Sequence, residues 1–195
     1  YIKRLDANKS LTKTDFNHAI LNKRLSLKNI KFTTFLYKDV FVIKKGKRNV
    51  MSRLSKGGQT PFIASINSNN GIKFLANIPP NHQGNTITVN YNGSIGEAFY
   101  QPIDFWASDD VNVLYPNNAK FPNLKLNVYL GMFFTTLIQK EKYKFNFGRK
   151  WHTERMEKSK IKLPVDSKGN PDWKFMEDYI KRLDANKSLT KTDFN

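Results

Sequence analysis

Hydrophobic residues follow two different spacings along this chain. Apolar and β-branched residues alternate with polar ones in short runs at residues 28–35, 61–65, 71–77, 86–90, 97–101 and 105–115, a pattern typical of half-buried strands. Between residues 124 and 139 the apolar positions instead recur every three or four residues, which predicts one amphipathic helix with its stripe in a core. That stripe consists of Leu126, Tyr129, Leu130, Phe133, Phe134, Leu137 and Ile138.

Shorter signals complete the expected order of elements. We expect a single helical turn at residues 36–41, a short helix at 153–158, a closing edge strand at 161–165 and a helix from 171 onward. Asn-rich turns at 67–71 and at Asn92-Gly93 predict hairpins. Strands and helices do not alternate, so the predicted fold class is α+β. It is a compact mixed domain of short, mostly antiparallel strands with one core helix, plus an exit spacer helix at the C-terminus.

One stretch of seventeen residues occurs twice, at 1–17 and again at 179–195. The second copy continues a helical run that begins near Trp173, so both copies are expected to belong to helical connectors. We therefore predict an N-terminal connector at 1–27, a globular domain at 28–170 and a C-terminal spacer helix at 171–195. An engineered duplication is the alternative interpretation.

The charge balance narrows the class of partner. Lys and Arg number 33 against 16 Asp and Glu, a formal net charge of +17, while 39% of residues are hydrophobic. A folded domain with this surplus predicts a polyanionic partner, with nucleic acid first and an anionic membrane surface second. No apolar run approaches the roughly 18 residues of a membrane span, so no membrane insertion is expected. The absence of cysteine excludes disulfides and thiolate zinc sites and fits a cytoplasmic location.

Three segments carry residues suited to contacting nucleic acid. A glycine-containing polar loop is predicted at 44–59, where backbone and cations can approach phosphates. Amide side chains at two predicted turns can pair with base edges, although ordinary turn chemistry also favours Asn there. A cationic stretch follows Gly148, and Trp151 within it is expected to be a core anchor. The candidate contacts are Lys45, Lys47, Arg48, Arg53, Asn67, Asn69, Asn70, Asn92, Ser94, Arg149, Lys150 and Arg155.

Catalytic and metal sites are poorly supported by the sequence. His18, His82 and His152 are far apart and show no metal-ligand spacing. No glycine-rich phosphate-binding motif occurs. Asp109 and Asp110 are adjacent on a predicted strand, where their side chains would point to opposite faces. We therefore expect no catalytic residue, no metal and no cofactor.

Several stretches in a fixed order resemble a known family. The order is FVIKKGKR, PFIASINSNNGI, TITVNYNGSIGEAFYQPIDFWASDDVNVL and FNFGRKWHTERMEKSKIKLPVDSKGNPDWKFMEDYI. It resembles a target-recognition domain from the DNA-specificity subunits of type I restriction-modification systems. The related specificity proteins of bifunctional restriction-methylation enzymes are similar. The resemblance covers residues 32–180.

This resemblance implies a non-catalytic protein that reads half of a split site in double-stranded DNA and so directs methylation and cleavage by partner subunits. Implied partners are methyltransferase subunits, restriction or motor subunits, and a second recognition domain or a second copy joined through spacer helices. The chain departs from the family pattern in having one recognition domain and a short spacer, which suits a fragment or a half-subunit. A nonspecific nucleic-acid or RNA-binding protein is the alternative, and it should prefer single strands.

Overall fold

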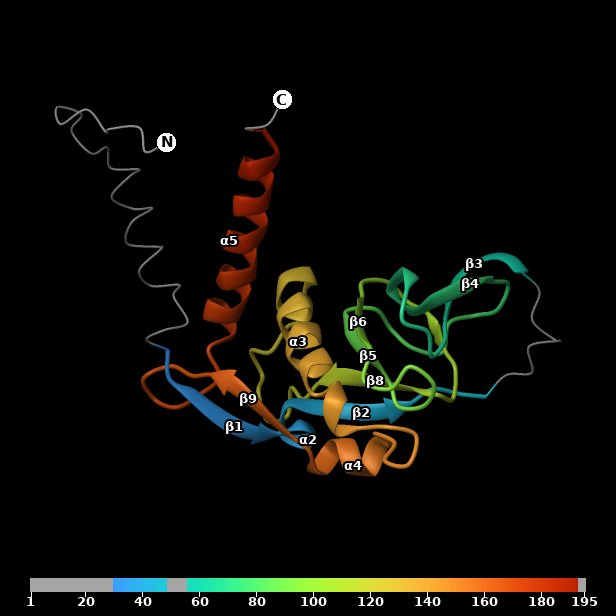
Figure 1. Cartoon of the computed structure of the whole chain (residues 1–195), viewed down its shortest axis with the longest axis horizontal. Helices are drawn as coiled ribbons and strands as arrows, with labels where there is room; N and C mark the ends of the chain where they lie inside the picture. The colour runs from blue at the N-terminus through green and yellow to red at the C-terminus, as the bar shows by residue number, and fades with distance from the viewer. Residues whose placement is uncertain (1–29, 49–55, 193–195) are drawn as a thin grey trace.

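A four-stranded antiparallel sheet lies at the centre of the domain (Figure 1). The computed structural model describes residues 30–48 and 56–192, with side chains described as far as residue 183. In spatial order the sheet contains β2 (Phe41–Lys45), β8 (Val111–Pro116), β5 (Thr86–Asn90) and β6 (Ala98–Gln101). The β-branched run of β5 is the strand that its composition predicts, and all five of its residues are buried.

The two faces of this sheet belong to two separate cores. Successive strand residues point to opposite faces, so Ile87, Val89 and Leu114 join one cluster while Val111 and Val113 join the other. The first, larger cluster includes the buried stripe of α3 (Val128–Lys140). The second lies toward a three-stranded sheet, visible to the right in Figure 1, in the order β4 (Ile72–Ala76), β3 (Lys56–Ile63) and β7 (Trp106–Ala107).

The hairpin expected from residues 61–77 is confirmed. Strands β3 and β4 pair antiparallel, and a short turn, η3 (Asn69–Gly71), precedes β4. Asn69 and Asn70 both have positive φ, at 49° and 52°, which is the backbone conformation that favours Asn at turns. Strand β7 pairs with β3 in parallel, while the other strand pairs are antiparallel. The predicted α+β class with mostly antiparallel strands is therefore confirmed.

Aromatic side chains fill the part of the larger core around Trp151. Trp151 is fully buried. Its ring centroid lies 5.4 Å from that of Tyr37 in an edge-on arrangement and 4.3 Å from that of Phe145, on which it stacks. This confirms the prediction that Trp151 is a core anchor. The surrounding elements are β1 (Phe32–Leu36), α2 (Tyr37–Val40), α4 (Thr153–Lys158) and β9 (Lys160–Pro164). Strands β1 and β9 form a two-stranded sheet, so Pro164 lies on an edge strand as predicted.

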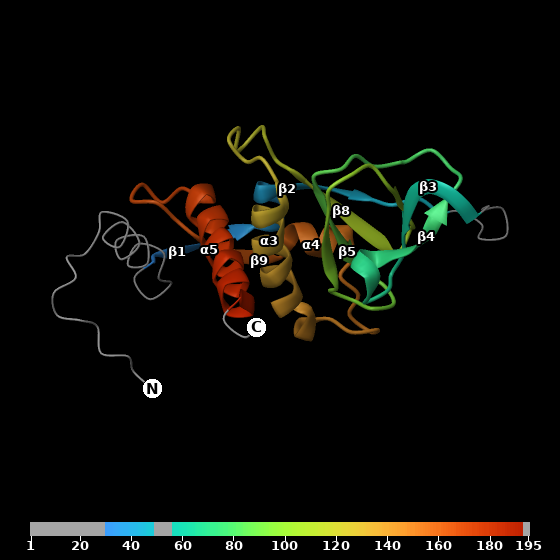
Figure 2. The ribbon, with the colours of Figure 1, turned by 90° about the horizontal axis from the view of Figure 1, so that it is seen from above.

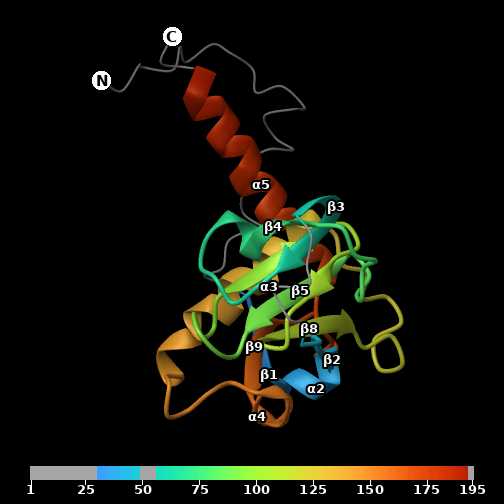
Figure 3. The ribbon, with the colours of Figure 1, turned by 90° about the vertical axis from the view of Figure 1, so that its right-hand side faces the viewer.

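Helix α5 (Trp173–Thr192) packs on α3 at its base and then leaves the domain (Figures 1 and 3). Near the base, the ring centroids of Trp173 and Phe134 lie 6.1 Å apart. Those of Tyr179 and Phe133 lie 6.4 Å apart, with the two ring planes at 90°. Figure 2, the view from above, shows α5 and α3 side by side. Within the described residues no helix is both long and apolar enough to cross a membrane.

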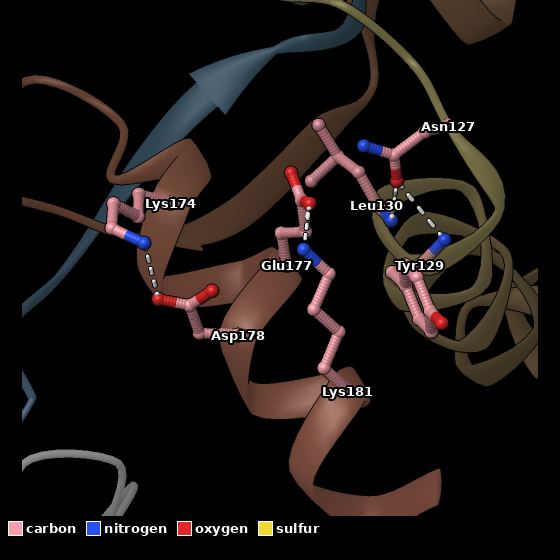
Figure 4. Close-up of polar contacts among 7 residues, drawn as sticks. All are labelled: Asn127, Tyr129, Leu130, Lys174, Glu177, Asp178 and Lys181. Carbon is pink, nitrogen blue, oxygen red and sulfur yellow. Dashed lines mark hydrogen bonds and ion pairs between the residues drawn. The ribbon is translucent and has the colours of Figure 1, made fainter. Parts of the chain in front are cut away.

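Helix α3 begins four residues later than its hydrophobic pattern suggests. Asn127 has an extended backbone, and its Oδ1 accepts hydrogen bonds from the backbone N–H groups of Tyr129 and Leu130, both at 3.0 Å (Figure 4). Such a cap defines the helix start irrespective of apolar spacing. Leu124 and Leu126 are buried before the helix begins.

Two predictions about polar segments are wrong. The loop expected at 44–59 is shorter, because Lys44 and Lys45 pair with β8, and residues 56–59 belong to β3. These strand residues were not predicted because the end of β2 and the start of β3 are exposed and carry polar side chains, so they lack apolar alternation. The strand expected across 105–115 is interrupted by a turn, so Asp109 and Asp110 lie in that turn instead of on a strand. The first copy of the repeated stretch and Arg53 lie outside the described residues.

Candidate nucleic-acid interface

Strand register brings several segments to one end of the four-stranded sheet. Lys45, the last residue of β2, pairs with Asn112, while Asn90 at the end of β5 pairs with Val111. Strand β6 begins beside the same end, where Ala98 pairs with Val89. The segments 46–48, 91–97 and 108–110 therefore meet there, and we call them together the loop end. Helix α5 leaves from the other side of the sheet (Figure 1).

The segment after β2 is held tightly against the turn before β8. Gly46 N–H donates to the Val111 carbonyl at 2.9 Å, and Lys47 N–H donates to the Ala107 carbonyl at 3.0 Å. A Cβ on Gly46 would lie 2.1 Å from the Ser108 carbonyl oxygen, so glycine is required for this close approach. Lys47 and Arg48 then emerge with exposed side chains.

Two lysines of β2 lie over aromatic rings on opposite faces of the strand. Lys44 Nζ is 4.7 Å from the Tyr115 ring centroid, and Lys45 Nζ is 5.1 Å from that of Tyr91. The hydrogen bond with Tyr91 raises the pKa of Lys45, with the charges of Asp109 and Asp110 adding to the shift. Lys45 therefore stays protonated at neutral pH, as a phosphate contact requires.

Asn92 and Ser94 lie in the turn between β5 and β6. The Asn92 amide donates to Asp110 Oδ1 at 2.8 Å, and its backbone carbonyl accepts from the Ser65 hydroxyl. Ser94 is half-buried in the same turn, and Asn67, which follows Ser65 by two residues, is exposed. The donor of Asn92 is thus occupied inside the protein, where it links two turns of the loop end.

The side-chain amides of Asn69 and Asn70 also donate hydrogen bonds within the protein, but away from the loop end. Asn69 Nδ2 donates to the Ile72 carbonyl at 2.9 Å. Asn70 Nδ2 donates to the Tyr100 carbonyl at 3.0 Å and to Gln101 Oε1 at 3.3 Å. Tyr100 and Gln101 close β6, so the structure places Asn70 beside the opposite end of the sheet from Asn92. A base-reading role for these two amides stays a prediction.

The segment 142–151 adjoins the loop end and carries the last group of cations. Lys142 Nζ forms an ion pair with Glu97 at 2.9 Å. Trp151 is tied to the start of β8, because its carbonyl accepts from Asn112 Nδ2 at 3.1 Å. Between these anchors Arg149 is exposed, and the Lys150 carbonyl accepts from the guanidinium of Arg155.

The structure thus gathers most of the predicted contacts and separates a few. Those at or beside the loop end are Lys45, Lys47, Arg48, Asn92, Ser94, Arg149, Lys150 and Arg155. Sequence reasoning missed Lys44 and the rings of Tyr91 and Tyr115. Alternation along β2 could have separated Lys44 from Lys45, but no pattern in one sequence identifies the ring beneath each lysine.

A polar cleft of about 340 Å³ lies beside Lys44. Its lining residues are Lys44, Pro80, Asn81, His82, Gln83, Asp104 and Tyr115. His82 Nδ1 lies 2.8 Å from the Tyr115 hydroxyl, and its ring stacks 5.7 Å from Phe105. Burial, with the charges of Lys44 and Lys47, lowers the pKa of His82 to about 4, so His82 is neutral at pH 7. In the part of the chain that the structure describes, no three His, Asp or Glu residues gather as a metal site.

Comparison with known proteins places this chain in a family. Residues 29–192 match the model of the type I restriction modification DNA specificity domain. The specificity subunit S.BcgI of a type II restriction enzyme from Heyndrickxia coagulans is 37% identical over 168 residues, which is 86% of this chain and 47% of that protein.

Solved structures share the fold. The S subunit of a type I restriction-modification system from M. genitalium aligns with a TM-score of 0.58 and 19% identity, over 94% of this chain and 46% of that one. The HsdS subunit from Thermoanaerobacter tengcongensis aligns with a TM-score of 0.57 and 11% identity, over 92% and 46%. The chain thus spans about half the length of the relatives it matches. With most of its length matched by the family model, the chain belongs to the family of type I restriction modification DNA specificity domains.

Proposed function

We propose that this chain recognises a short, specific sequence in double-stranded DNA through its loop end, as part of a restriction-modification specificity subunit. The observation that carries this proposal is the strand register. It brings Lys45, Lys47 and Arg48, at and just after the end of β2, to the same end of the sheet as the turn that carries Asn92 and Ser94, in a chain of net charge +17. Its family membership supports sequence recognition over general attraction to polyanions.

The two kinds of side chain have different proposed tasks. Cations position a protein on the phosphate backbone without reading sequence, whereas amides and hydroxyls can contact base edges. Lys45, Lys47 and Arg48 are suited to phosphates because they are exposed and have no carboxylate ion pair in the described residues. Asn67 is an exposed amide two residues after Ser65, whose hydroxyl binds the Asn92 carbonyl, and it is proposed as a base contact. Arg53 is proposed as a further phosphate contact from its sequence position alone.

The role is proposed to be non-catalytic, with chemistry supplied by partner subunits. Residues 28–170 would form the recognition unit, and 171–195 would form a spacer joining a second recognition domain or a second copy. Methyltransferase subunits, and restriction or motor subunits, are the proposed partners, in the cytoplasm. A solved structure of similar fold describes complex assembly of a type I restriction-modification system, and this supports partners of this class.

Selection from a random duplex pool tests the proposal. The chain should enrich one short motif, and its affinity for that duplex should fall steeply with salt. Replacing Lys45, Lys47 and Arg48 together by Gln should reduce the salt slope by roughly three, because each phosphate contact contributes about 0.9. Lys168→Gln, an exposed change in the turn before α5, is the matched control and should leave the slope unchanged.

Two results would contradict the proposal. Equal affinity for selected and scrambled duplexes would indicate nonspecific binding. Tighter binding to single strands than to any duplex would favour the RNA or single-strand alternative, in which exposed aromatics stack on unpaired bases.

A further inference from the structure

Phe147 is presented to solvent at the tip of a turn beside the loop end. Its side chain is 77% exposed, whereas Phe145, two residues earlier, stacks on the buried Trp151 at 4.3 Å. One aromatic of the FNF sequence therefore anchors the turn while the other points outward. Single exposed apolar residues are common on protein surfaces, so exposure alone implies no function.

The turn that carries Phe147 is well braced. Arg149 N–H donates to both the carbonyl and the Oδ1 of Asn146, at 3.0 and 2.9 Å, and Asn146 N–H donates back to the Arg149 carbonyl at 3.4 Å. The stacked Phe145 and the hydrogen-bonded carbonyl of Trp151 fix the two sides of the turn. A turn held this way loses little backbone conformational entropy when its exposed ring binds.

Two cations accompany the ring. Lys150 Nζ lies 5.1 Å from the Phe147 ring centroid, and Arg149 follows two residues after Phe147 with an exposed side chain. An apolar group beside cations suits a partner that offers an apolar slot between two rows of anions. Stacked base pairs between two phosphate backbones are such a partner. Proteins that use the minor groove commonly insert Phe, Leu or Ile between base steps while Arg and Lys line the groove.

We propose that Phe147 inserts as a wedge between two neighbouring base pairs of the bound duplex, from the minor groove, with Arg149 and Lys150 on the flanking phosphates. This inference rests on the proposed function and adds to it a residue that deforms the DNA. The bound duplex is then kinked, and part of the selectivity arises from how easily each base step unstacks. Pyrimidine–purine steps, which unstack most easily, are the expected wedge positions.

The experiment compares Phe147→Ala with Lys150→Gln and with Ile103→Ala. Ile103 is 60% exposed, just beyond the opposite end of β6, and serves as the matched apolar control. Each variant is measured with a dye-labelled duplex of roughly 30 base pairs, recording affinity at several salt concentrations and the bend by energy transfer between the ends.

Phe147→Ala should weaken duplex binding about tenfold, a loss typical of a stacking aromatic, and should reduce the bend. Its salt slope should stay unchanged because the ring is neutral, whereas Lys150→Gln should lower that slope by about one. Ile103→Ala should change none of these, and the thermal midpoints of the two apolar variants should match wild type because both side chains are exposed.

The outcomes separate this inference from the proposed function. Unchanged affinity and bend in Phe147→Ala overturn the wedge, even where the wild type selects one sequence. Loss of affinity and bend in Phe147→Ala supports the wedge, and if the wild type then binds scrambled duplexes equally well, only the proposed sequence recognition fails. A wild type that binds no duplex overturns both.

Discussion

The ring of Tyr91 links Lys45 to the turn that precedes β8. Lys45 Nζ lies 5.1 Å from the ring centroid, and the Tyr91 hydroxyl donates to the Asp109 carbonyl at 2.5 Å. One side chain from the turn after β5 therefore orients a cation of β2 and ties down the neighbouring turn. A cation over an exposed aromatic gains roughly 0.5–1 kcal/mol, enough to bias where the lysine points.

We expect Lys45→Gln to weaken duplex binding and to reduce the salt slope by about 0.9, because one phosphate contact is lost. Tyr91→Phe keeps the ring but loses the hydroxyl's bonds to Asp109 and Lys45, so it should cost about 1 kcal/mol of folding stability. It should leave the slope unchanged, because Lys45 stays protonated at neutral pH. Salt-dependent binding and denaturant unfolding measure the two effects. A slope that stays the same in Lys45→Gln would exclude Lys45 from the phosphate contacts.

The junction of α3 and α5 should depend on Asn127. Asn127→Ala removes the cap of α3 and should lower the free energy of unfolding by about 1 kcal/mol, whereas Asn127→Ser, which keeps a capping oxygen, should lose much less. Lys181 and Asn127 together lower the pKa of Glu177 on α5 (Figure 4). The Glu177 carboxyl should therefore titrate at higher pH in Asn127→Ala, which NMR can follow. Equal stability of the Ala and Ser variants would mean that the cap contributes nothing.

Tyr37 carries a hydroxyl that the fold does not use. Its side chain is fully buried, and the oxygen has no hydrogen-bond partner in the described residues. Tyr37→Phe should therefore leave stability unchanged or raise it by up to about 1 kcal/mol, since an unpaired buried polar group is removed. Tyr37→Ala should lose about 3–5 kcal/mol, because the ring packs against Trp151 and Phe41. Denaturant unfolding measures these free energies. Clear destabilisation in Tyr37→Phe would mean that the Tyr37 hydroxyl does have a hydrogen-bond partner.

His82 should make stability depend on pH. Its folded pKa of about 4 lies below the ordinary value of 6.5, so the unfolded chain binds this proton more readily. Stability from this group is therefore complete above pH 6.5 and declines as the pH falls toward 4. Allowing for solvent screening, the total loss should be about 2 kcal/mol.

The control for this effect is His82→Gln, which cannot titrate. Its free energy of unfolding should fall less steeply than that of wild type between pH 6.5 and 4, whatever its stability at pH 7. Lys44, Lys47, Asp104 and Tyr115 surround His82 and remain in both proteins. Parallel pH profiles for the two proteins would show that His82 is not the group responsible.

Much of the fold was predictable because local pattern and tertiary contact agree. The β-branched run at 86–90, the helical turn before Phe41 and the short helix at 153–158 all form where local spacing predicts them. Prediction failed where exposed strand ends carry polar residues, as at Lys44 and Lys45, or where a cap sets the boundary, as at Asn127. Hydrophobic periodicity does not signal either feature.

The sequence alone determined the fold class, the buried stripe of α3, the excess of cations and the family resemblance, because these depend on composition and on the spacing and order of segments along the chain. Only the tertiary structure decided which cations share a surface. Strand register sets Lys45 beside the 108–110 turn and places Asn70 beside the far end of β6. Register depends on pairing between segments distant in sequence, so a one-residue slip would turn Lys45 to the face that Lys44 now occupies.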